Sequence, residues 1–336
     1  MGTGTPVRAG ILGTGRAVPS EVLSNRDLEA MVDTSDAWIV ERTGIRERRI
    51  LGTGRVTSDL AAEAGRRACE AAGIEPAELD AIIVGTVTPD VPMPATAVYV
   101  QRKLGAGPCP AFDLSAACAG FLYGLSIADA FIKSRQHRRV LVIGVEILSR
   151  VLDWNDRGTC ILFGDGAGAA VVGPVEQRDG EATRGILSTH LYADGRGAEH
   201  LVIPAGGSAL PASAETVDAK LHKVKMAGQA VFTHAVRGTS AACLRALAEN
   251  GKTPDDIDLV VAHQANLRII EAVSQRCGLP MERFYINIHR YGNTSSASVP
   301  IALDECLEQG RVVPGMLILF TAFGAGFSWG SALIRW

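Results

Sequence analysis

The hydrophobic positions of this chain fall into short apolar runs separated by turn-forming residues. Residues 140–145 and 316–320 are continuous in apolar side chains but far shorter than the ~18 residues that a membrane helix needs. Other stretches, such as 58–72, are rich in Ala at helical spacing. The pattern predicts strands that are buried on both faces and covered by helices, as in parallel α/β sheets.

One helix–strand unit occurs twice, at an offset of 178 residues. The segment 73–84, GIEPAELDAIIV, resembles the segment 251–262, GKTPDDIDLVVA, with Gly, Pro and Asp at matching places. Each copy follows an Ala-rich segment that predicts a helix, and each ends in an apolar strand. At the same offset, the predicted helix 115–130 matches 293–308, and the predicted strand 140–145 matches 318–323.

This duplication predicts two similar α/β halves. We place them at 1–175 and 176–336, with the break in the Gly-rich and charged segment 173–185. Ligands of such sheets gather where the carboxyl ends of strands from both halves meet. Reactive residues are therefore expected at strand ends and helix starts.

Composition narrows the functional classes. The chain has 336 residues, 47% of them hydrophobic, and 33 basic against 36 acidic residues, which gives a net charge of −3. Nothing in this balance favours a nucleic acid or a membrane as partner. The seven cysteines include no CxxC pair, so neither a metal site nor a disulfide framework is expected. Because the first ten residues lack a signal-peptide pattern, we expect a cytoplasmic protein.

Three segments carry side chains suited to chemistry. Cys118 lies in DLSAACAG, between a predicted strand at 110–114 and a helix from 120, where helix N–H groups favour a thiolate. His263 ends a buried strand, and Asn293 opens a helix after Gly292. A buried structural Cys, a satisfied core His and an N-cap Asn are the alternatives for each residue taken alone. At the offset of 178, Asn293 matches Ser115, so the duplication brings the helix starts of both halves together.

The Gly-rich run 323–330, FGAGFSWG, follows a strand and offers bare backbone N–H groups to an oxyanion. A similar run, FGDGAG, occupies 163–168. Neither run is a GxGxxG that opens a helix, so nucleotide binding is a weak interpretation and a tight turn is the default.

Together these segments closely resemble the β-ketoacyl-acyl carrier protein synthase III family of condensing enzymes, almost end to end. The resemblance is carried by five segments: 33–48, DTSDAWIVERTGIRER; 156–159, DRGT; 163–170, FGDGAGAA; 263–270, HQANLRII; and 292–295, GNTS. It implies a thiolase-like fold of duplicated α/β halves in αβαβα layers, a homodimer, and no cofactor beyond the coenzyme A thioester substrate.

The resemblance also implies roles for individual residues. Cys118 would be acylated by acyl-CoA, and His263 and Asn293 would polarise a malonyl thioester as it loses CO₂. The backbone N–H groups of Cys118 and Gly326 would form the oxyanion hole. The residues implied for coenzyme A are Trp38, Arg42, Arg157, Gly228, Gln229 and Asn266.

Two further sites follow from the same resemblance. The acyl pocket would include Met93, Leu162 and Phe232, with Met93 reaching across the dimer. Arg268 and Arg276 would dock the acidic carrier protein. Thr233 and Gln275 stand where the family carries lysines, so the docking charge is thinner than usual and malonyl-CoA is an alternative donor.

The sequence leaves four functions open. The first is the primary synthase, which joins acyl-CoA to malonyl carrier protein and starts fatty-acid synthesis. The second is a condensing enzyme or acyltransferase of secondary metabolism, of polyketide or quinolone type. The third and fourth are a non-catalytic partner subunit and a Cys hydrolase. The intact Cys118, His263 and Asn293 favour the first.

Overall fold

Two sheets of the same design form the framework of the protein. The computed structural model describes residues 7–177 and 183–336, so the centre of the predicted break between the halves lies outside the described residues. The first sheet has the strand order β1 (Arg8–Ala17), β7 (Gly166–Val175), β6 (Val140–Glu146), β4 (Ala81–Gly85), β5 (Ala111–Leu114). The second has the order β8 (Gly185–Ala193), β13 (Ser328–Arg335), β12 (Leu317–Gly324), β11 (Leu259–Ala262).

The four strands of the second sheet match four of the first, whereas β5 has no counterpart. Each sheet contains a parallel pair, β4 beside β6 and β11 beside β12, and the second strand of each pair is antiparallel to the strand that follows it, β7 or β13. The 3₁₀ turns η1 (Pro76–Glu78) and η5 (Pro254–Asp256) repeat at the offset of 178 residues. So do η2 (Ala117–Ala119) and η7 (Ser295–Ala297). The duplicated elements expected from the sequence are therefore present in the fold.

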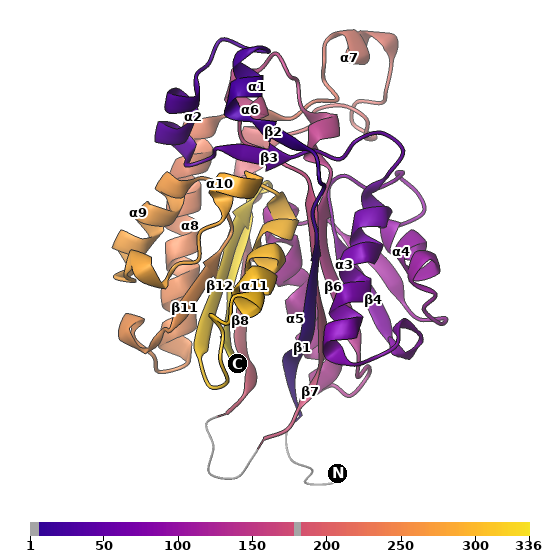
Figure 1. Ribbon diagram of the computed structural model, residues 1–336, viewed down its shortest axis with the longest axis vertical. Helices are drawn as coiled ribbons and strands as arrows, with labels where there is room; N and C mark the ends of the chain where they lie inside the picture. Colours follow the sequence, from indigo (N-terminus) through magenta and orange to yellow (C-terminus); the bar gives the residue numbers. More distant parts are fainter. Residues whose placement is uncertain (1–6, 178–182) are drawn as a thin grey trace.

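The helices form three layers around the sheets (Figure 1). One face of the first sheet packs on α3 (Thr57–Ala72) and α4 (Thr96–Leu104), through alternate residues such as Ile82 and Leu141. The outer face of the second sheet packs on α8 (Gly228–Glu249) and α9 (Leu267–Cys277). The central layer contains α5 (Gly120–Lys133) and α11 (Ser298–Glu308), which gives the αβαβα order predicted from the sequence.

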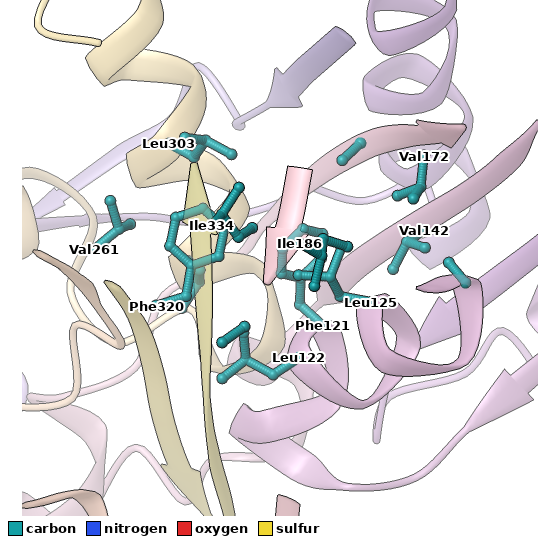
Figure 2. Close-up of a cluster of buried hydrophobic side chains, with 14 of the residues drawn as sticks. Phe121, Leu122, Leu125, Val142, Val172, Ile186, Val261, Leu303, Phe320 and Ile334 are labelled. Atoms are coloured by element: carbon teal, nitrogen blue, oxygen red, sulfur yellow. The ribbon is translucent and has the colours of Figure 1, made fainter. Parts of the chain in front are cut away.

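The central layer holds the largest core cluster (Figure 2). Phe121, Leu122 and Leu125 of α5 and Leu303 of α11 meet inward-facing residues of both sheets, including Val142 and Phe320. Because α5 and α11 are covered by a sheet on each side, their N-terminal ends are fixed within the interior.

Small elements cover the carboxyl ends of the inner strands, at the top of Figure 1. They come from distant parts of the sequence: β2 (Val22–Ser24), α1 (Asn25–Glu29), α2 (Asp36–Thr43), β3 (Glu47–Arg49), α6 (Arg157–Cys160), β9 (Leu201–Val202), α7 (Ala214–Asp218), β10 (Lys225–Met226) and α10 (Ile288–Tyr291). Across the described ranges, no helix combines the length and apolar character required to span a membrane.

Candidate active site

The nucleophile candidate Cys118 sits in a strained turn between β5 and α5. The preceding residue, Ala117, has φ +44°, a left-handed conformation that an L-residue rarely adopts. Close packing fixes the turn, because a Cβ added at Gly85 would lie 2.9 Å from the Gly120 carbonyl carbon. The small side chains predicted around Cys118 therefore allow the helix start to approach β4 directly.

The second half repeats this turn. Ser295, which matches Ala117 at the offset of 178, also has a left-handed φ of +49°. Asn293 lies two residues before it, and His263 follows the last residue of β11. The fold thus places all three candidates where strand ends and helix starts of both halves meet.

One cavity of about 590 Å³ is lined by Cys118, His263 and Asn293 together. Each of the three residues is only 6% exposed. A second, mostly apolar cavity of about 270 Å³ also reaches Cys118. Cys118 therefore borders both a larger cavity and a smaller, mostly apolar one.

The hydrogen bonds of His263 select its neutral form and its tautomer. The hydroxyl of Ser298 accepts from the Gln264 N–H at 2.7 Å and lies 3.0 Å from His263 Nδ1, to which it can donate. This leaves the ring proton on Nε2, which has no hydrogen-bond partner among the described residues. Burial lowers the pKa of His263 to about 3, so a neutral Nε2–H donor faces the cavity at physiological pH.

Asn293 is held so that its amide hydrogens are available. Its Oδ1 accepts from the Ser295 N–H at 2.8 Å, and its backbone bonds to Leu162 and Gly164. Within 7–177 and 183–336, no acceptor is found for Nδ2. Two neutral donors, from His263 and Asn293, can therefore meet one oxygen of a ligand.

Burial of Cys118 opposes the thiolate expected from its place at a helix start. Burial raises the pKa of the Cys118 thiol to about 12, and Glu146 acts in the same direction. Hydrogen bonding to Ser295 and to the Cys118 backbone N–H opposes the rise without overcoming it. Because desolvation outweighs the helix start, the proton leaves the sulfur only as a reaction partner takes it.

The predicted oxyanion residue Gly326 lies one to two residues away from the best-placed position. A Cβ added at Gly326 would meet Ser328, and Gly326 lines neither cavity. By contrast, a Cβ at Gly324 would lie 2.5 Å from the Cys118 nitrogen, and Ala325 lines the smaller cavity beside Cys118. β12 extends to Gly324, so the turn that carries Gly326 begins at Ala325.

Comparisons with known proteins identify the family of this chain. Residues 112–195 match the sequence model of the family described as 3-oxoacyl-[acyl-carrier-protein (ACP)] synthase III, and residues 247–336 match its C-terminal model. A β-ketoacyl-[acyl-carrier-protein] synthase III from Caldanaerobacter subterraneus subsp. tengcongensis is 54% identical over 330 residues, covering 98% of both chains. This chain belongs to the β-ketoacyl-acyl carrier protein synthase III family.

Solved structures of the family share the whole fold. The 3-oxoacyl-[acyl-carrier-protein] synthase III from Aquifex aeolicus VF5 superposes with a TM-score of 0.88 at 45% identity, over 98% of this chain and 100% of that one. The priming β-ketosynthase from the R1128 polyketide pathway gives 0.89 at 37% identity, over 100% and 98%. The chain is thus an acyltransferase of the condensing type that initiates fatty-acid synthesis, and the secondary-metabolic alternative is not favoured.

The residues expected to bind coenzyme A lie along and above the large cavity. In this synthase the Trp38 ring is flanked by two guanidinium groups, Arg42 at 4.7 Å and Arg157 at 4.9 Å from the ring centroid. Arg42 also lines the cavity, together with Gly228, Gln229 and Asn266. Asn266 is fixed by donating from Nδ2 to the Arg42 carbonyl at 3.0 Å. Arg42 thus links the Trp38 ring, which lines neither cavity, to the cavity that reaches Cys118.

The residues expected in the acyl pocket are placed differently. Leu162 and Phe232 line the large cavity, not the small one, and Met93 lies in neither, with 86% of its surface exposed. The small cavity is instead lined mainly by apolar residues of the β9–β10 region and of two loops: Val87, Leu148, Leu201, Val202, Ile203 and Val224. These residues belong to no recognisable sequence motif. Most of them lie in or beside the two short antiparallel strands β9 and β10, which follow the first half.

The two arginines expected to dock the carrier protein lie on α9. Arg268 lines the rim of the large cavity and donates from Nε to the Glu41 carbonyl at 3.1 Å. Its guanidinium is 3.6 Å from the Glu41 carboxylate, which partly offsets its charge. Arg276 is exposed in the last turn of the same helix.

Proposed function

We propose that this synthase works in two steps at Cys118. An acyl group first passes from coenzyme A to the sulfur, and a malonyl carrier-protein thioester then loses CO₂ and takes up that acyl group. The products are 3-oxoacyl carrier protein, CO₂ and coenzyme A. The observation that carries this proposal is the single cavity lined by Cys118, His263 and Asn293.

The first step is a thioester exchange. The Cys118 sulfur attacks the acyl-CoA carbonyl, and the oxyanion meets the N–H groups of Cys118 and, at the β12 turn, Ala325. Among the described residues, no backbone acceptor is found for the Ala325 N–H. Collapse breaks the carbon–sulfur bond to coenzyme A, whose sulfur takes the proton that Cys118 gives up. Each such donor is worth about 3–4 kcal/mol in the barrier.

The second step needs donors but no strong base. Loss of CO₂ from the malonyl group leaves its electron pair as an enolate, whose oxygen accepts from His263 Nε2–H and Asn293 Nδ2–H. The enolate carbon attacks the acyl carbonyl on Cys118, the new carbon–carbon bond forms as the carbon–sulfur bond breaks, and the departing Cys118 thiolate takes a proton from water to restore the thiol. The lowered pKa of His263 supports this role, because a neutral imidazole remains a donor throughout.

For the first substrate, the arginine-flanked Trp38 supports coenzyme A as the carrier. Guanidinium groups bind phosphates and stack on aromatic rings, so Arg42 and Arg157 suit an adenine nucleotide at the cavity mouth. We assign no metal or resident cofactor to the reaction. Arg268 and Arg276 would receive the acidic carrier protein, and malonyl-CoA would serve as the alternative donor.

For the assembly, we propose a cytoplasmic homodimer. Three exposed apolar side chains, Val91, Met93 and Val98, lie near one another in sequence, with exposed fractions of 37%, 86% and 41%. Such a patch supports burial against a second copy of the chain. In the dimer, Met93 would close the small cavity of the partner.

The test of the first step is acylation followed by intact mass. Wild type mixed with acetyl-CoA should gain one acyl group per chain, and Cys118→Ser should gain none. Cys109→Ser is the matched control, because Cys109 is the one partly exposed thiol among the described residues and should not affect the adduct. Normal acylation of Cys118→Ser, or its loss in Cys109→Ser, would refute the assignment.

A further inference from the structure

A buried acid that the two steps above do not use lies beside Cys118. Glu146 ends β6 and has 0% exposure. Its carboxylate accepts from the Thr88 hydroxyl at 2.7 Å, from the Val87 N–H at 3.1 Å and from the Thr86 hydroxyl at 3.3 Å. From the other half it accepts from the hydroxyls of Ser295 at 3.2 Å and Ser296 at 3.4 Å.

These bonds join the two halves at the reaction centre. Val87 and Ser295 both line the small cavity that reaches Cys118. Ser295 also donates its N–H to Asn293 Oδ1, so the same residue that binds Glu146 orients the catalytic amide. One carboxylate thus connects a wall of the acyl cavity with the donor for the malonyl oxygen.

The duplication shows that this acid is not required by the fold. At the offset of 178, Glu146 matches Gly324, which ends β12 and packs directly on Cys118. The last residue of β12 is therefore a glycine that packs on the turn of Cys118. The equivalent last residue of β6 is Glu146, whose carboxylate contacts the turn after Asn293. Only the second half's turn has the hydroxyl pair, Ser295 and Ser296, where the first half has Ala117 and Cys118.

Burying this carboxyl group has an energetic cost that the fold does not recover through a salt bridge. Among the described ion pairs none includes Glu146, and all its donors are hydroxyls or an N–H. An unpaired buried acid is destabilising relative to an apolar residue of similar size. Its place at the site, with donors from both halves, points to function.

We propose that Glu146 is a positioning residue for the decarboxylation step, holding Ser295 and the 86–88 loop so that the Asn293 amide faces the malonyl thioester. The proposal rests on the two-step function given above. Acylation of Cys118 does not use the Asn293 side chain, so the two half-reactions respond differently to loss of Glu146.

Glu146→Gln keeps the shape but replaces one acceptor oxygen by a donor. CO₂ release from malonyl thioester should fall about tenfold to a hundredfold, the effect of weakening the hydrogen bond between Glu146 and the hydroxyl of Ser295, the residue whose N–H orients Asn293. Acylation by acetyl-CoA should stay within about threefold of wild type. Glu146→Asp retains the carboxylate and should recover most of the CO₂ release.

Glu305→Gln is the matched control, since Glu305 is a buried carboxyl group of 1% exposure in the second half that lines neither cavity. It should lower the melting temperature without changing the ratio of the two half-reactions. If Glu146→Gln does not fold, Thr88→Val replaces it, because this variant removes the hydroxyl that donates to Glu146 at 2.7 Å from a residue that lines neither cavity, and it should show the same selective loss.

Equal losses in both half-reactions, or unchanged CO₂ release in a folded Glu146→Gln or Thr88→Val protein, would overturn the proposal. Failure of the two-step function is recognised separately, because wild type itself would then not acylate or not release CO₂.

Discussion

At the scale of single residues, burial favours the neutral form of the His263 donor and the protonated form of the Cys118 nucleophile. His263 has a pKa lowered to about 3, while the pKa of Cys118 is raised to about 12, both through desolvation. No ion pair therefore forms between them in the free enzyme. Negative charge develops on the substrate oxygens during the reaction, and fixed N–H groups of the protein stabilise it by donating hydrogen bonds.

His263 should make folding stability depend on pH in a defined window. In the unfolded chain its pKa is near 6.5, so between pH 6.5 and 3 the unfolded state binds a proton that the folded state does not. The stability from neutral His263 is complete above pH 6.5 and is lost as pH falls. From pH 7 to 5, wild type should lose about 2 kcal/mol more unfolding free energy than His263→Gln. Urea titrations of both proteins measure this, and identical slopes would show that His263 is protonated when folded.

Ser298 should act through the tautomer of His263. Ser298→Ala removes the hydroxyl that donates to Nδ1 and lets the ring proton move to that nitrogen. CO₂ release should fall about tenfold while acylation changes little, and Ser298→Thr should recover part of the loss. Measured initial rates that fall equally for both half-reactions would contradict this role.

The residues that sequence reasoning found and missed differ in a physical way. Cys118, His263 and Asn293 stand in motifs, at the strand ends and helix starts where a duplicated sheet gathers ligands. Ser298 and Glu146 stand in no such motif. Ser298 contacts His263, and Glu146 contacts Ser295, two residues after Asn293. A lone acid after an apolar run, such as Glu146, reads in sequence as a solvated strand end, and only the packing of η7 against β6 reveals its burial.

At the scale of elements, the two turns η2 and η7 position the candidate catalytic residues: η2 contains Cys118, and η7 begins two residues after Asn293. Both precede a central helix, both contain a left-handed residue, and both are pressed against the end of an inner strand. The sequence offset of 178 predicted these equivalences, since helix and strand patterns survive duplication. It did not predict the small cavity, because β9 and β10 belong to neither repeated unit.

The contact between β12 and η2 should be sensitive to one methyl group. In Gly324→Ala the new Cβ would lie 2.5 Å from the Cys118 nitrogen, so the nucleophile turn must shift. Acylation should slow at least tenfold, with a stability loss of about 1–3 kcal/mol. Gly195→Ala is the control, because its Cβ would meet nothing within 4 Å and its backbone is not left-handed. Acylation of Gly324→Ala at the wild-type rate would show that the turn does not depend on this contact.

At the scale of the whole molecule, a single chain supplies the large cavity that Cys118, His263 and Asn293 line, whereas the Met93 side chain is left 86% exposed. A homodimer would weigh twice the 35.4 kDa of the chain. Light scattering coupled to gel filtration should give that mass for wild type and a lower mass for Met93→Asp, whose charge opposes apolar burial. A monomeric wild type would exclude the proposed closure of the small cavity by a partner.

The central claim is that Cys118 carries the acyl group while His263 and Asn293 serve the loss of CO₂. The most direct measurement follows both events in one sample of Asn293→Ala, with acyl-enzyme read by intact mass and CO₂ release from malonyl thioester read in parallel. We predict an acyl adduct at the wild-type rate and CO₂ release reduced by at least a hundredfold. Normal CO₂ release from this variant would contradict the account.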